Sequence, residues 1–190
     1  MKKRYLLFGA IWLTILGFLV YEGQDAPAIK TITEDRTVTL QHDTAQFTID
    51  LTGRWQEIDE TKMGMTLYQL EEDALIDIIM EVGGLSYYAP NEIAALFGEK
   101  IPLDSDGFTL TDACTDEASN GERGYASFLY EGKNSNLHMD LYIYMPIEGI
   151  RYYIAYLYPN DIQAEGYQEG LDIISSLTFL DLQSLYAAFL

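Results

Sequence analysis

The chain has 190 residues, 48% of them hydrophobic, which suits one globular domain, and its formal net charge is -19 at pH 7. A surface this acidic repels phosphate backbones, so the composition disfavours nucleic acid as a partner. Cys114 is the single cysteine, which excludes an intrachain disulfide and a thiolate metal cluster.

A basic and apolar N-terminus predicts a targeting element. Lys2, Lys3 and Arg4 precede an uncharged run from Tyr5 to Tyr21, which is at the lower limit for a bilayer-spanning helix. Ala26-Pro27-Ala28 has Pro in the middle of the small-residue pattern that signal peptidases cleave. We therefore expect an uncleaved anchor with a cytoplasmic N-terminus and an extracytoplasmic domain; the alternative is secretion after signal-peptide cleavage.

The next segments predict strands joined by short turns and interrupted by one helix. Apolar alternation predicts strands at residues 36–41, 47–51, 64–71, 74–82, 108–111 and 124–130. Trp55 follows Gly53 as a core or rim aromatic. Pro90 is placed to begin a helix with Ile93, Leu96 and Phe97 on one side.

Two further strands flank Glu148-Gly149, where the glycine tolerates the positive φ of a tight hairpin turn. In the first strand Leu137 to Met145 alternate an apolar face with a face carrying His138, Asp140 and two tyrosines. A two-residue loop places Ile143 and Met145 on one face with Ile150, Tyr152, Ile154 and Tyr156. It places Tyr142, Tyr144, Arg151 and Tyr153 on the opposite face.

A helix should follow, capped by Asn160 or Asp161, because either side chain can accept from the free N–H groups of the first turn. Its apolar stripe is Tyr167, Leu171, Ile174 and Leu177. Gly166 and Gly170 lie beside this stripe and predict close packing of the helix on the sheet.

Together these segments predict an α+β fold: a mostly antiparallel sheet of seven or eight strands packed with two main helices. Three segments resemble the PsbP/Mog1/DcrB-like superfamily, in its bacterial envelope branch. They are Phe47 to Leu51 with Gly53 and Trp55, the run Gly149 to Tyr156, and the last segment Ile173 to Phe179. The resemblance implies an α/β/α sandwich, mostly non-catalytic roles, and no catalytic motif to transfer. It covers residues 36–179, within an expected domain of residues 29–179 that follows the anchor and tether at residues 1–28.

No catalytic, cofactor or metal site is predicted. His42 lies in a turn and His138 on a polar strand face, so both are interpreted as surface histidines rather than as bases for a nucleophile. Asp104-Ser105-Asp106-Gly107 is similar to the middle of a calcium loop, but Pro102 and Ala113 stand where ligands are needed. A solvated turn is expected there.

Two features have binding potential. Tyr142, Tyr144 and Tyr153 are core residues if a helix covers them, which we favour, and an aromatic binding surface if they are open. The amphipathic tail at residues 180–190 carries Leu182, Leu185, Tyr186 and Phe189 at helical spacing. We expect it to pack on its own sheet; the alternative is docking on a protein partner.

The leading hypothesis is a membrane-anchored extracytoplasmic accessory or binding module that is not an enzyme and has an unidentified protein partner. The alternatives are an extracytoplasmic hydrolase using carboxylates and a structural subunit of an envelope complex. The sequence specifies no ligand, cofactor or oligomeric state.

Overall fold

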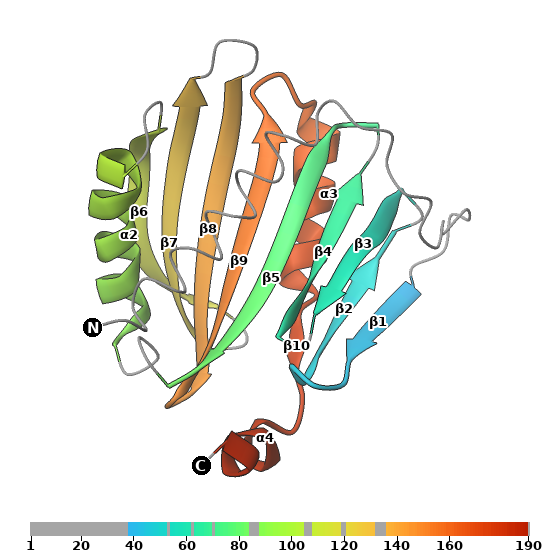
Figure 1. The fold of residues 1–190 in the computed structure, drawn as a ribbon. Helices are drawn as coiled ribbons and strands as arrows, with labels where there is room; N and C mark the ends of the chain where they lie inside the picture. The colour runs from blue at the N-terminus through green and yellow to red at the C-terminus, as the bar shows by residue number, and fades with distance from the viewer. Residues whose placement is uncertain are drawn as a thin grey trace.

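The computed structural model describes residues 38–52, 54–61, 63–69, 71–83, 88–104, 108–118, 121–131 and 136–189. Within these residues the chain forms ten strands and three helices (Figure 1). The strands are β1 (Val38–His42), β2 (Phe47–Leu51), β3 (Trp55–Thr61), β4 (Gly64–Gln69), β5 (Ala74–Val82), β6 (Phe108–Ala118), β7 (Gly121–Glu131), β8 (Asn136–Ile147), β9 (Ile150–Pro159) and β10 (Thr178–Phe179). The helices are α2 (Pro90–Asp104), α3 (Ala164–Ser175) and α4 (Leu182–Phe189).

Seven strands form one sheet in the order β3-β4-β5-β9-β8-β7-β6, and three form a second sheet in the order β1-β2-β10. Every strand pair is antiparallel, which confirms the predicted α+β class. The prediction of one sheet with seven or eight strands missed β3 and β10. In β3 a bulge between Glu57 and Asp59 interrupts the period-two pattern, and β10 has only two residues.

Two apolar layers cover opposite faces of the large sheet. On one face α2 lies against β6 and β7 (Figure 1), and its Ile93 and Phe97 pack in one core cluster with Phe128. On the other face α3 and β2 contribute Ile174 and Phe47 to a second cluster. The sheet is therefore enclosed between α2 on one side and α3 with the small sheet on the other, a sandwich of the predicted kind.

In the hairpin of β8 and β9, the side chains that share a face are not the ones predicted. The turn is as predicted, because Gly149 has a φ of 86° and Ile147 pairs with Ile150. However, a bulge between Tyr144 and Ile147 inserts one extra residue into β8. The bulge contains Pro146, which has no N–H to donate to a strand ladder.

One extra residue exchanges the faces of the rest of the strand. Tyr144 pairs with Tyr152, and Ile143 with Tyr153. The predicted set of Tyr142, Tyr144 and Tyr153 on one face is therefore wrong, since Tyr153 points to the α2 side and the other two point to the α3 side.

The predicted capping of α3 by Asn160 or Asp161 is also wrong. The N-cap is Gln163, in extended conformation and without a side-chain capping bond. Asn160 and Asp161 lie in a preceding turn, where Ile162 N–H donates to the Pro159 carbonyl at 3.1 Å. The Asn160 N–H donates to the Asn136 carbonyl of β8, so this residue continues the strand pairing and the helix starts later.

The C-terminal residues form α4, which lies beyond the end of the strands in Figure 1. Leu182 is buried and belongs to the α3-side cluster. Among the described residues no helix has the length and apolar character needed to cross a bilayer. The predicted anchor from Tyr5 to Tyr21 lies outside these residues.

Candidate functional site

The three tyrosines singled out in the sequence do not form a binding surface. Tyr142, Tyr144 and Tyr153 are 5%, 2% and 1% exposed. Tyr153 packs edge-on against Phe97 of α2, with ring centroids 5.9 Å apart, and its hydroxyl donates to Glu81. The open aromatic surface is thus contradicted, because both sheet faces are covered at these positions.

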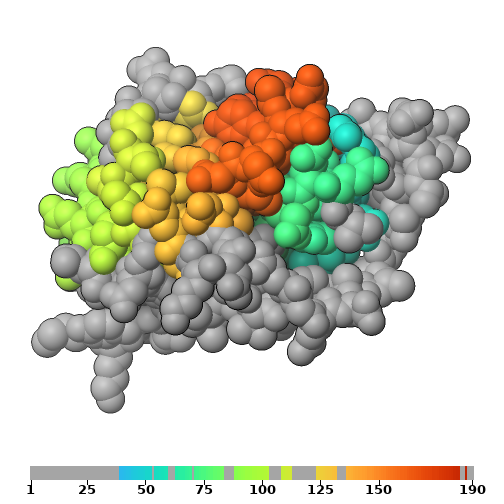
Figure 2. Space-filling view, turned by 90° about the horizontal axis from the view of Figure 1, so that it is seen from above, coloured from blue at the N-terminus to red at the C-terminus, as the bar shows by residue number. Residues whose placement is uncertain are grey.

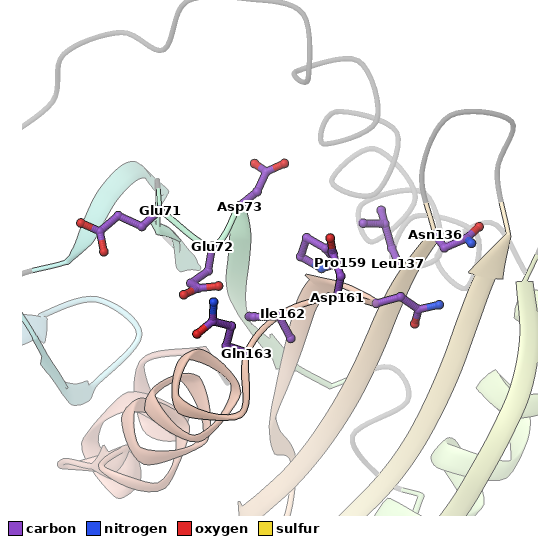
Figure 3. Close-up of a pocket in the computed structure, with 10 residues that line it drawn as sticks. Glu71, Glu72, Asp73, Asn136, Leu137, Pro159, Asp161, Ile162 and Gln163 are labelled. Carbon is purple, nitrogen blue, oxygen red and sulfur yellow. The ribbon is translucent and has the colours of Figure 1, made fainter.

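A cavity of about 620 Å³ opens at one end of the large sheet. The β4–β5 turn, the first residues of β8 and the β9–α3 loop surround it (Figure 3). Seen from above, these segments lie side by side, in green, gold and orange (Figure 2). The lining residues are Glu71, Glu72, Asp73, Asn136, Leu137, Pro159, Asn160, Asp161, Ile162 and Gln163, which we call the acidic pocket.

Four of the ten described lining residues are carboxylates and none is basic. Glu71 has an exposed partner outside the pocket, Arg54, at 3.4 Å, and such pairs contribute little. Leu137, Pro159 and Ile162 supply an aliphatic part. The pocket therefore combines negative charge with an apolar wall.

Local contacts hold the acidic turn in place. Asp73 adopts a φ of 53°, a left-handed conformation that aspartate tolerates in turns, and its carboxylate accepts from the Tyr68 hydroxyl. The buried Gln69 side chain accepts from the Glu72 N–H at 2.8 Å. Figure 3 shows the Glu72 side chain directed toward Gln163 of the opposite wall.

Glu72 and Asp73 lie between the predicted strands at residues 64–71 and 74–82, and Asp161 was predicted only as a helix cap. Their spacing along the chain carries no signal of proximity. The pocket arises because β5 pairs with β9 in the middle of the sheet, which brings the ends of both connections together.

The strand β8, whose first residues line the pocket, also carries a buried carboxylate, Asp140, which is 1% exposed. Its Oδ1 accepts from Ser127 Oγ at 2.6 Å and from the Tyr125 hydroxyl at 3.0 Å. Its Oδ2 accepts from the Tyr158 hydroxyl at 3.1 Å and from the Tyr167 hydroxyl at 3.4 Å. Among the described residues, four neutral hydroxyls thus take the place of a cation around this carboxylate.

The tyrosines that surround Asp140 are held in the neutral form. Burial raises the pKa of Tyr158 above its ordinary value, and the negative charge of Asp140 raises it further. The same two causes raise the pKa of Tyr167. Both phenols therefore remain hydrogen-bond donors at physiological pH.

The interpretation of His42 as a surface residue is wrong, because its side chain is 1% exposed. Its Nδ1 accepts from the Ala45 N–H at 3.0 Å, so the proton resides on Nε2, which donates to the Gly64 carbonyl at 3.1 Å. His138 is half-buried and stacks on Tyr158. The backbone contacts of His42 indicate a structural role.

Other predicted features fall partly outside the described residues. Residues 105–107 of the calcium-like loop lie there, as do the side chains of Cys114, Leu185, Tyr186 and Phe189. Within the described part of the chain, no group of three or more His, Cys, Asp or Glu residues is arranged to hold a metal ion.

No protein-family model and no curated protein matches this chain. Solved structures do match it. CyanoP, the cyanobacterial PsbP of Synechocystis sp. PCC 6803, has a TM-score of 0.59 at 10% identity and aligns over 80% of this chain and 98% of its own. LpqN, involved in cell envelope biogenesis of Mycobacterium tuberculosis, has a TM-score of 0.50 at 14% identity, over 76% of this chain and 91% of its own.

A protein from Bacteroides thetaiotaomicron VPI-5482 also has a TM-score of 0.50 at 14% identity, over 76% of this chain. The alignment includes 48% of that protein, so this chain spans about half of its length. The chain has a PsbP/Mog1-like fold, which confirms the resemblance seen in the sequence. At these identities the likeness concerns the fold alone.

Proposed function

We propose that this protein is a membrane-anchored extracytoplasmic accessory module that binds a basic segment of a protein partner and performs no catalysis. Its fold is similar to that of CyanoP and of LpqN, a protein involved in cell envelope biogenesis. The basic and apolar N-terminus supports an anchored, extracytoplasmic location.

The acidic pocket is the observation that carries the binding role. Its volume of about 620 Å³ lies in the range of ligand sites. A lysine or arginine side chain suits its lining, because the aliphatic stem can lie along Leu137, Pro159 and Ile162 while the charged end meets the carboxylates. The net charge of -19 additionally steers basic partners toward the surface.

The experiment is a binding titration with the full-length protein in detergent and a fluorescent peptide of alternating lysine and serine. The pocket variant Glu72→Gln/Asp161→Asn is compared with Glu99→Gln/Glu148→Gln, which removes two exposed charges on α2 and on the β8–β9 turn. We expect the pocket variant to bind about tenfold more weakly and the control less than about twofold, since only the first loses pocket charge.

Equal losses in the two variants would show that net charge, rather than the pocket, attracts the peptide. A peptide of glycine and serine tests for sequence-independent binding and should not bind. Raising the salt concentration should weaken binding to the wild type, because the attraction is partly exposed to solvent.

We propose the tail as a second docking element, because α4 lies beyond the strands in Figure 1 and Leu185, Tyr186 and Phe189 recur at helical spacing after the buried Leu182. We expect deletion of residues 180–190 to cost about 2–3 kcal/mol of stability, because it removes a buried leucine. Deletion of residues 183–190 should cost less than about 1 kcal/mol. Chemical denaturation measures both, and a large loss in the shorter deletion would assign all of α4 to the core.

A further inference from the structure

We propose that Asp140 is a positioning residue that fastens both ends of the β9–α3 loop and thereby sets the shape of the acidic pocket. The effect of Asp140 on binding rests on the proposed function, whereas its effect on the β9–α3 loop does not. Nothing in the sequence pattern links Asp140 to this loop, because Asp140 lies in β8 and the loop begins only after β9.

The two phenols that donate to Asp140 Oδ2 flank the loop. Tyr158 is near the end of β9, and Tyr167 lies in the first turns of α3. Their hydroxyls meet the same oxygen at 3.1 Å and 3.4 Å, and their rings lie 5.1 Å apart. Residues 160–163, which line the pocket, connect these two points.

Asp140, which accepts from both phenols, is itself fixed to the sheet. Asp140 lies in β8, between β7 and β9, and Ser127 and Tyr125 of β7 hold its second oxygen. The same strand begins with Asn136 and Leu137, which form the facing pocket wall. The Asn160 N–H donates to the Asn136 carbonyl at 3.0 Å, so β8 supports the loop at its first residue too.

The start of α3 needs such an attachment. Gln163 makes no side-chain capping bond, so the first turn lacks the usual local support for its N–H groups. Tyr167, one turn into the helix, joins this turn to the sheet through Asp140. A hydrogen bond to a buried carboxylate is stronger than one between neutral groups, and the shorter bond from Tyr158 meets the same oxygen, so the two phenols together join the loop and the first turn of α3 to the sheet.

The test measures amide hydrogen exchange by mass spectrometry on the full-length protein in detergent, comparing wild type with Tyr167→Phe. The reporters are the N–H groups of Asn160, Ile162 and Tyr167, each of which donates to a backbone carbonyl. We expect exchange of residues 160–167 to rise about tenfold while exchange of α2 is unchanged.

Tyr153→Phe is the control, because it also removes a phenol that donates to a carboxylate, in this case Glu81 on the opposite face of the sheet. It should leave exchange of residues 160–167 unchanged. Unchanged exchange in Tyr167→Phe, or an equal rise in the control, would overturn the inference. Asp140→Asn is a stronger variant, and Tyr167→Phe keeps the test valid if that variant does not fold.

Binding of the lysine–serine peptide separates this inference from the proposed function. If wild type binds the peptide and Tyr167→Phe binds it about fivefold more weakly, Asp140 positions a working pocket. If the loop exchanges faster but wild type does not bind, the positioning role stands and the proposed function fails. If wild type binds and the faster-exchanging variant binds equally well, Asp140 does not set the shape of the pocket.

Discussion

Raising the pH beyond about 10 should unfold this protein in one steep transition, because its core contains tyrosines that can ionise only when exposed. Five of them are at most 9% exposed and have a pKa raised by burial: Tyr142, Tyr152, Tyr153, Tyr156 and Tyr158. Negative charge adds to the shift, from Asp140 at Tyr158 and from Glu81 at Tyr153.

The direction of the effect follows from proton binding. A tyrosine in the unfolded chain loses its proton near pH 10, whereas the buried residue keeps its proton, so the folded state binds more protons above that pH. The stabilisation from the raised pKa is fully present below pH 10 and is lost as the pH rises toward the folded-state pKa. Each residue lowers the free energy of unfolding by about 1.4 kcal/mol per pH unit.

Five such residues together remove about 7 kcal/mol per pH unit, against a total stability of about 5–15 kcal/mol for an ordinary domain. Unfolding should therefore be complete within about two pH units. In one titration that records both signals, the tyrosinate absorbance of the five buried residues should appear together with the loss of the native circular dichroism. Tyr152→Phe should make the transition less steep, because unfolding then releases about one proton fewer. Exposed tyrosines such as Tyr88 ionise in the folded state, so an early partial rise in absorbance is expected. Complete tyrosinate absorbance while the circular dichroism stays native would contradict this account.

Gly170→Ala should destabilise the protein strongly, although the same change inside a helix ordinarily stabilises it by about 1 kcal/mol. A Cβ atom at this position would lie 2.4 Å from Cζ and the hydroxyl oxygen of Tyr156. Tyr156 is fully buried, with neighbouring rings of Tyr158 and Trp55 at 4.7 Å and 6.3 Å, so it cannot move aside. We expect a loss of about 3 kcal/mol, typical of an overpacked core.

Gly166→Ala is the matched control one turn earlier on the same helix. Its Cβ would meet Cγ of Glu72 at 2.9 Å, and this flexible side chain can turn away. We therefore expect a change within about 1 kcal/mol of wild type, of either sign. Urea denaturation of both variants measures the difference, and equal stabilities would show that α3 lies farther from β9 than the structure places it.

The sequence by itself determined the features that depend on local periodicity. Alternation in β2 and the apolar stripe of α2 were readable because each residue's burial follows from its neighbours two to four positions away. Alternation also predicted the strands β5 and β8, although most residues on both faces of these two strands are buried. The glycines of α3 predicted close packing on the sheet, which is confirmed at Gly170, where Tyr156 leaves no room for a Cβ atom. The order of these segments was sufficient for the α+β class and for the resemblance in fold.

Only the tertiary structure decided which side chains meet across the chain. One extra residue at the bulge beside Pro146 moved Tyr153 to the face opposite Tyr142, and no local pattern marks such an insertion. The acidic pocket joins residues 71–73, 136–137 and 159–163, and Asp140 meets hydroxyls from β7, β9 and α3. These contacts arise from antiparallel pairing between strands that are distant in sequence. Their chemistry depends on strand register, which periodicity cannot specify when a single bulge reverses it.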